Sequence, residues 1–259
     1  MTEDRLADPA MLEAVADIAR RAGALIMAIY ETDFAVRGKG DASPVTEADE
    51  RAEALILSAL QALDYSVPIV AEEAVAAGNC PTVGNWFWLV DPLDGTKEFI
   101  NRNGEFTVNI ALVHRGEPVL GVVLAPALRR LFAGVAGQGA WLDEGGSRRA
   151  IQCRPVPTEG LTVVASRSHS DAAALDAYLG ERRVAALVNA GSSLKLCLVA
   201  AGEADLYPRL GRTMEWDIAA GHAVLAAAGG AVTKLDGAPL RYGKPGFENP
   251  HFAAAALGR

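Results

Sequence analysis

Cysteine and histidine are scarce in this chain of 259 residues, and neither occurs in a metal-binding pattern. The three cysteines are Cys80, Cys153 and Cys197. They lie far apart and are odd in number, which fits reduced thiols better than a disulfide framework or a zinc site. The four histidines include no H-E-x-x-H pair, so a zinc enzyme is not expected.

Long apolar runs and basic runs are also missing. No run has the length of a transmembrane helix, and residues 1–5 lack the charged-then-apolar order of a signal peptide. The formal net charge is −8, so neither a nucleic-acid polymer nor an anionic membrane surface is expected as the main partner. We expect a cytoplasmic protein, and leave open a loose association with the inner membrane and the choice between monomer and homodimer.

The order of apolar patterns predicts two regions that together form an α/β fold. In residues 1–156, two amphipathic helices precede a short strand, a buried central strand and a run of strands typical of an antiparallel meander. In residues 157–259, short strands alternate with helices, which is the pattern of a mostly parallel sheet. We therefore predict an α+β N-terminal domain, 1–156, and an α/β C-terminal domain, 157–259.

The clearest chemical signal is a pair of acids after an apolar stretch. Residues 86–90 predict a buried strand, and Asp91 and Asp94 follow where that strand is expected to end. Pro92 stiffens the turn between them. With Thr96, the acids offer only oxygen ligands, a set that favours Mg²⁺ bound together with phosphate. An acidic turn that merely ends the strand is the competing interpretation, since Asp, Pro and Gly are common turn formers.

Two further acids, Glu72 and Asp217, occupy similar positions. Glu72 follows an expected strand over 68–71, and Asp217 begins an expected helix. If the two regions face each other, both acids converge with Asp91 and Asp94. Carboxylates ~4 Å apart repel by roughly 1 kcal/mol per pair in water and by about 4 kcal/mol at an effective dielectric constant of 20. Two or three divalent ions would offset that repulsion and assist phosphoryl transfer.

Residues 91–99, DPLDGTKEF, resemble the signature of the lithium-sensitive, Mg²⁺-dependent inositol-monophosphatase superfamily. Six further motifs follow the order expected for that superfamily, at residues 72–73, 103–109, 166–169, 191–195, 207–209 and 215–217. Together they are similar to the CysQ-type 3′(2′),5′-bisphosphate nucleotidases over nearly the whole chain. Lys97 and Glu98 stand where the inositol phosphatases more often have a Thr-Asn pair.

This resemblance implies a layered αβαβα sandwich of the inositol-monophosphatase and sugar-phosphatase type, with the site between the two domains. It implies a first metal ion on Glu72, Asp91 and the Leu93 carbonyl. A second ion would lie on Asp91, Asp94 and Asp217, and a third, weaker ion would share Glu72.

The resemblance also assigns the remaining site residues. Asp49 and Thr96 would orient the attacking water and count, with Glu72, as catalytic. The substrate-binding set would be Leu93, Asp94, Gly95, Thr96, Gly191, Ser192, Ser193, Lys195 and Asp217. The roles of Arg167, His169 and Arg209 are left open.

Three of these assignments compete with ordinary helix capping. Asp49 is the fourth residue of a capping-box sequence that begins at Thr46. Asp217 could serve as the N-cap of its helix. The segment Gly191-Ser192-Ser193 precedes another expected helix and could cap it instead of holding phosphate.

The expected activity is Mg²⁺-dependent phosphomonoester hydrolysis without a covalent intermediate. By resemblance, the substrate is the 3′-phosphate of adenosine 3′,5′-bisphosphate, converted to AMP, with cleavage of PAPS to APS as a second reaction. Inositol monophosphatase or fructose-1,6-bisphosphatase activity is the alternative within the same class. A non-catalytic adenine-nucleotide binder is the alternative in a different class, and the presence of every expected acid argues against it.

Overall fold

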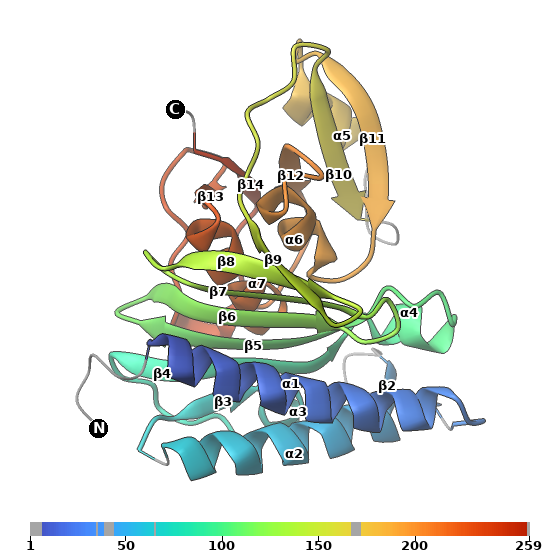
Figure 1. The fold of residues 1–259 in the computed structure, drawn as a ribbon, viewed down its shortest axis with the longest axis vertical. Helices are drawn as coiled ribbons and strands as arrows, with labels where there is room; N and C mark the ends of the chain where they lie inside the picture. Colours follow the sequence, from blue (N-terminus) through green and yellow to red (C-terminus); the bar gives the residue numbers. More distant parts are fainter. Residues whose placement is uncertain (1–6, 35, 39–43, 65, 167–171, 258–259) are drawn as a thin grey trace.

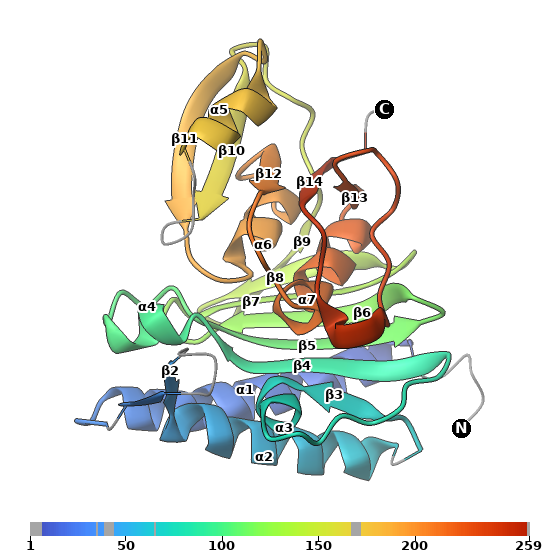
Figure 2. The same ribbon diagram turned by 180° about the vertical axis from the view of Figure 1, so that it is seen from behind.

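The computed structural model describes residues 7–34, 36–38, 44–64, 66–166 and 172–257. Helices and sheets alternate in five layers, which Figures 1 and 2 show from opposite sides. The paired helices α1 and α2 cover a seven-stranded sheet, α6 and α7 separate it from a five-stranded sheet, and α5 covers the far side of that sheet. The predicted αβαβα sandwich is confirmed.

The first layer consists of α1 (Pro9–Tyr30) and α2 (Glu47–Leu63), and both helices are predicted by the sequence. Asp8 caps α1 by accepting a hydrogen bond from the Met11 amide at 2.7 Å. Each helix buries an apolar face against the seven-stranded sheet. Before α2, the short strands β1 (Val36–Gly38) and β2 (Pro44–Thr46) pair antiparallel, where the sequence predicts only a loop.

The seven-stranded sheet has the order β3-β4-β5-β6-β7-β8-β9. Its strands β3 and β4 are parallel, and the later neighbours are antiparallel, which confirms the predicted meander. The strands are β3 (Ile69–Ala71), β4 (Trp86–Asp94), β5 (Thr107–His114), β6 (Glu117–Ala125), β7 (Arg130–Val135), β8 (Gly139–Glu144) and β9 (Ser147–Ile151).

The end of β4 differs from the prediction. The strand continues through Asp94, so both acids lie within it, because backbone pairing with β5 resumes after an irregularity between Asp91 and Asp94. Two short helices, α3 (Glu72–Ala76) and α4 (Thr96–Ile100), replace segments expected to be irregular. Both helices begin at the end of a strand, and both begin with a predicted site residue.

The second sheet has the order β11-β10-β12-β14-β13 and is mixed instead of mostly parallel. Strand β10 pairs parallel with β11 and β12, whereas β14 pairs antiparallel with β12 and β13. The sequence predicts no strand at β13, which forms as the chain turns back along β14. The elements are β10 (Leu161–Ser166), α5 (Ala172–Leu179), β11 (Val184–Ala190), α6 (Leu194–Ala200), β12 (Leu206–Arg209), α7 (Glu215–Ala227), β13 (Gly230–Lys234), the 3₁₀ turn η2 (Pro245–Phe247) and β14 (Phe252–Ala256).

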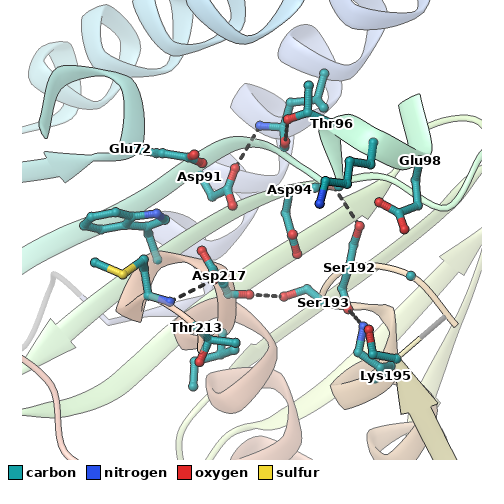
Figure 3. A pocket seen from close by; sticks show the side chains of 18 of the residues that line it. Glu72, Asp91, Asp94, Thr96, Glu98, Ser192, Ser193, Lys195, Thr213 and Asp217 are labelled. Carbon is teal, nitrogen blue, oxygen red and sulfur yellow. Dashed lines mark hydrogen bonds between the residues drawn. The ribbon is translucent and has the colours of Figure 1, made fainter. Parts of the chain in front are cut away.

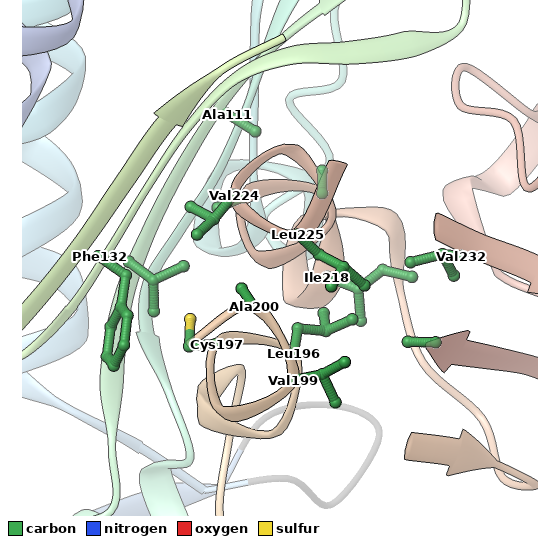
Figure 4. Packing of buried hydrophobic residues seen from close by; sticks show 14 of the residues in the cluster. Ala111, Phe132, Leu196, Cys197, Val199, Ala200, Ile218, Val224, Leu225 and Val232 are labelled. Carbon is green, nitrogen blue, oxygen red and sulfur yellow. The ribbon is translucent and has the colours of Figure 1, made fainter. Parts of the chain in front are cut away.

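Helices α6 and α7 share one hydrophobic cluster with both sheets (Figure 4). Phe132 from the first sheet and Val232 from the second lie in this cluster on either side of the helices. Helix α7 packs so closely on the first sheet that a side chain at Gly121 would come within 2.3 Å of the Ala220 carbonyl oxygen. Helix α7 is therefore held closely against β6, and it also contacts β4 and β5. The division into domains 1–156 and 157–259 stays a prediction.

None of the described helices combines the length and the apolar character needed to cross a membrane.

Candidate active site

One cavity of ≈ 540 Å³ lies where the ends of β3 and β4 meet the first turns of α6 and α7. Figure 3 shows four carboxylates directed toward a common space from three separate parts of the chain. Of the predicted site residues, only Asp49 lies behind the cavity wall. The others line it: Glu72, Asp91, Leu93, Asp94, Gly95, Thr96, Gly191, Ser192, Ser193, Lys195 and Asp217.

The stiff turn in β4 carries Asp91 and Asp94, which differ in burial. Asp91 is 1% exposed, and its carboxylate accepts a hydrogen bond from the Leu93 amide at 3.0 Å. Asp94 is less buried and faces the cavity. Gly95 follows with φ +89°, a left-handed conformation that suits glycine and starts α4 at Thr96. The strand therefore gives way to a helix directly after the second of these carboxylates.

Asp49 contacts Thr96 from the first turn of α2. One carboxylate oxygen accepts hydrogen bonds from the Thr46 amide at 2.8 Å and the Thr46 hydroxyl at 2.7 Å. The other oxygen accepts the Thr96 hydroxyl at 3.2 Å. Capping and contact with Thr96 are therefore not exclusive, because they use different oxygens of one buried carboxylate.

Asp217 lies in the third position of α7 and is not its N-cap residue, which is Met214. Its carboxylate nonetheless accepts the Met214 amide at 2.8 Å and so caps the helix from within its first turn. The residue remains only partly buried and lines the cavity. The competing interpretation of Asp217 as the N-cap is wrong in position, because the helix begins two residues earlier than predicted.

The turn between β11 and α6 forms the opposite wall. Ser193 is the N-cap residue of α6, but its side chain does not cap the helix. Lys195 is 4% exposed, and its ammonium group donates to the carbonyl oxygens of Ser192 at 2.6 Å and Ala190 at 3.3 Å. The ammonium is thus largely occupied by the turn itself.

Burial makes the ionised forms of Asp94 and Asp217 unfavourable in this cavity. Burial, reinforced by the charge of Glu72 and opposed by Lys195, raises the pKa of Asp94 to about 6. Burial, together with Asp94 and Glu72, raises the pKa of Asp217 well above its ordinary value. Burial also lowers the pKa of Lys195 to about 8. Lys195 therefore does not supply enough positive charge to keep both Asp94 and Asp217 ionised at their ordinary pKa values.

A hard divalent cation fits this donor set. Every acid in the set offers oxygen ligands, and a cation would offset the burial and the charge repulsion that together raise the pKa values of Asp94 and Asp217. Among the described residues, no three His, Cys, Asp or Glu side chains already form a tight metal cluster. The carboxylates instead border a shared cavity.

Asn109 and Glu105 contact residues of the cavity wall, and neither was assigned a role from the sequence. Asn109 lies fully buried on β5, and its amide nitrogen is 3.4 Å from both Asp94 Oδ2 and the Asp217 carbonyl oxygen. Glu105 accepts the Gly191 amide at 2.8 Å. The motif that contains Asn109 and Glu105 is visible in the sequence. The residues that each of them contacts, which are distant in the chain, cannot be identified from it. Arg209 lines the cavity, whereas Arg167 and His169 lie outside the described residues.

Comparison with known proteins shows which family has this architecture. Residues 9–257 match the model of the inositol monophosphatase family. The 3′(2′),5′-bisphosphate nucleotidase CysQ of Escherichia coli strain K12 is 48% identical over 245 residues, which cover 93% of this chain and 98% of that protein. The protein of the same name from Haemophilus influenzae is 33% identical over 250 residues, which cover 93% of this chain and 91% of that protein.

Solved structures agree. The crystal structure of CysQ from Bacteroides thetaiotaomicron is 38% identical, has a TM-score of 0.83 and covers 98% of this chain and 100% of that chain. The inositol monophosphatase from Anabaena is 26% identical, with a TM-score of 0.73 and coverage of 95% and 89%. The chain belongs to the inositol monophosphatase family.

Proposed function

We propose that this protein is a Mg²⁺-dependent phosphomonoesterase that removes the 3′-phosphate of adenosine 3′,5′-bisphosphate and releases AMP. The observation that carries the proposal is the convergence of Glu72, Asp91, Asp94 and Asp217 on one cavity, where burial raises the pKa values of Asp94 and Asp217. The substrate class comes from relatives named 3′(2′),5′-bisphosphate nucleotidase, which match nearly the whole chain. Cleavage of PAPS to APS is the second expected reaction.

In this proposal the acids hold two or three Mg²⁺ ions between domains 1–156 and 157–259. Glu72, Asp91 and the Leu93 carbonyl would hold the first, and Asp91, Asp94 and Asp217 the second. A third would share Glu72. When bound, the ions supply neutralisation of the phosphate charge and increase the acidity of the attacking water.

The chain's own residues suit the proton transfer. The Thr96 hydroxyl has a single proton, and Asp49 Oδ1 at 3.2 Å is a nearer acceptor for it than the Leu93 carbonyl oxygen at 3.4 Å. Its lone pairs are then free to accept a proton from water, and Asp49 can take the threonine proton in turn. The water oxygen forms a bond to phosphorus as the bond to the 3′-oxygen breaks, and the leaving oxygen takes a proton from solvent. Asp49 therefore acts through Thr96.

In this proposal the phosphate that is cleaved and the rest of the nucleotide bind to opposite walls of the cavity. The backbone from Leu93 to Thr96 lines the cavity beside the acids where α4 begins, which suits a phosphate held beside metal ions. The opposite wall includes Lys195 and Arg209. These two cations supply positive charge for the second phosphate of a bisphosphate, since charge-assisted hydrogen bonds discriminate it from a monophosphate.

Phosphate release measured across a substrate panel tests the proposal. With Mg²⁺, adenosine 3′,5′-bisphosphate should have a higher kcat/KM than 3′-AMP or inositol 1-phosphate. Asp91→Asn is the matched control, and it should abolish Mg²⁺-dependent turnover while keeping the size of the side chain. Equal values for the bisphosphate and 3′-AMP, or faster inositol 1-phosphate hydrolysis, would overturn the substrate. Nucleotide binding without any turnover would favour the non-catalytic binder.

A further inference from the structure

Two neighbouring serines connect the acids contributed by different halves of the chain. The Ser192 hydroxyl lies 2.8 Å from the carbonyl oxygen of Asp94, and the Ser193 hydroxyl lies 2.5 Å from that of Asp217. We propose that Ser192 and Ser193 are positioning residues that fix the separation of Asp94 and Asp217 for metal binding. This inference rests on the proposed metal-dependent function, and it differs from the nucleotide-binding role predicted for the serines.

The hydrogen-bond capacity of the serines favours positioning over nucleotide contact. A serine hydroxyl has one proton to donate. Ser193 directs it to the Asp217 carbonyl, and Ser192 directs it between the carbonyls of Asp94 and Glu105, each at 2.8 Å. Both donors are therefore used by the backbone of the site. Neither hydroxyl can donate to a nucleotide without releasing that backbone.

The turn that carries the serines is itself held in an unusual conformation. Ser192 has φ +49°, which is disfavoured for residues other than glycine. Lys195 donates to the Ser192 carbonyl at 2.6 Å, and Glu105 accepts the amide of Gly191 at 2.8 Å. A side chain at Gly95 would come within 2.2 Å of the Ser192 hydroxyl. A strained residue held by so many contacts indicates that its position matters.

The Asn109 side chain on β5 contacts the same two acidic residues. Its amide nitrogen lies 3.4 Å from Asp94 Oδ2 and 3.4 Å from the Asp217 carbonyl, which also accepts Ser193. The first turn of α7 is thus attached to β4 through one side chain on β5 and two on the β11–α6 turn. Because Mg²⁺ demands near-ideal octahedral geometry, fixing the two carboxylates in advance should favour its binding.

Removal of each hydroxyl tests the role without removing a metal ligand. Ser192→Gly keeps the left-handed backbone accessible, and Ser193→Ala removes only the donor. Calorimetric titration with Mg²⁺ in the absence of nucleotide should show binding weakened by about 10- to 100-fold in each variant, as is typical when a partner of a metal ligand is lost. The double variant should lose less than the product of the single effects, since the serines act on one separation.

A matched control is Thr32→Ala, which removes a hydroxyl bonded to the Ile29 carbonyl at 2.8 Å away from the cavity. It should leave Mg²⁺ binding unchanged. A merely structural role for the serines predicts equal losses of Tm with and without Mg²⁺, whereas positioning predicts that the increase in Tm caused by Mg²⁺ becomes smaller.

Unchanged Mg²⁺ affinity with a raised KM would overturn the inference and make the serines nucleotide contacts. Unchanged affinity with equal losses of Tm would overturn it in favour of a structural role. Either result leaves the proposed function intact. Failure of the unmutated protein to bind Mg²⁺ would instead overturn the proposed function, and the inference with it.

Discussion

The first turns of α2 and α7 share one local design. Each has an aspartate at the third helical position, Asp49 in α2 and Asp217 in α7, and each carboxylate accepts the backbone amide of its N-cap residue at 2.8 Å. Their surroundings differ. Asp49 is buried against two hydroxyl donors, whereas Asp217 lines a cavity where burial, together with Asp94 and Glu72, raises its pKa.

This difference shows that capping chemistry alone does not determine what an acid can do. Hydrogen bonds from Thr46 and Thr96 stabilise the charge on Asp49. They also leave one carboxylate oxygen, Oδ1, directed at the Thr96 hydroxyl. Burial beside other acids destabilises the charge on Asp217 and makes that residue suitable for a cation. The same helix position thus suits Asp49 to the proposed role of general base and Asp217 to the proposed role of metal ligand.

Asp217→Asn should have the largest effect. The amide oxygen can still accept the Met214 amide, so α7 keeps its first turn, but the proposed second metal site loses a charged ligand. We expect kcat to fall by about 10³-fold, at the upper end of what loss of one charge-stabilising group causes. In metal-free buffer Tm should rise, because one of several crowded charges is gone. Steady-state kinetics and thermal unfolding measure both, and full activity would contradict the assignment.

Asp49→Asn should have a smaller effect on rate and the opposite effect on stability. Loss of the base that acts through Thr96 should lower kcat by about 10²-fold with little change in KM. Loss of a negative charge in the first turn of α2 should lower the free energy of unfolding by roughly 0.3–1 kcal/mol. Single-turnover rates beside unfolding in saturating Mg²⁺ separate the two effects. A lower Tm with unchanged rates would leave Asp49 as a helix cap only.

The pH dependence of stability should show the smallest effect. The pKa of Asp94 is raised in the folded protein from 3.8 to about 6, so the folded state binds more protons than the unfolded state between those values. Stability in metal-free buffer should therefore fall as pH rises from about 4 to about 6. Because Asp94 borders the cavity, water screens part of the effect, and we expect on the order of 1 kcal/mol from this group.

Mg²⁺ provides the control for this measurement. Denaturant unfolding followed across the same pH range with saturating Mg²⁺ should show the loss of stability reduced, because the ion favours the ionised carboxylate that burial disfavours. An identical pH dependence with and without Mg²⁺ would contradict the placement of Asp94 at the metal site.

Features that depend on neighbours in sequence were predictable. The capping box at Thr46 and Asp49 forms as its spacing indicates, and the apolar pattern places α1, α2 and the meander correctly. Features that depend on distant partners were not. Strand β4 extends through Asp94 because β5 continues to pair with it, and β13 exists because β14 offers an edge to it. Short strands and helices depend on such partners more than on their own composition.

The sequence by itself determined the α/β class and the oxygen-rich donor set, and the layered arrangement followed from the resemblance to a known family. Apolar periodicity and turn residues are local properties, and the motif around Asp91 and Asp94 carries its chemistry in its composition. Only the tertiary structure decided which side chains face the cavity and where their protons go. Ser192 and Ser193 are adjacent in sequence, yet their hydroxyls reach Asp94 and Asp217 because packing of α6 and α7 between two sheets brings distant backbone carbonyls within hydrogen-bond distance.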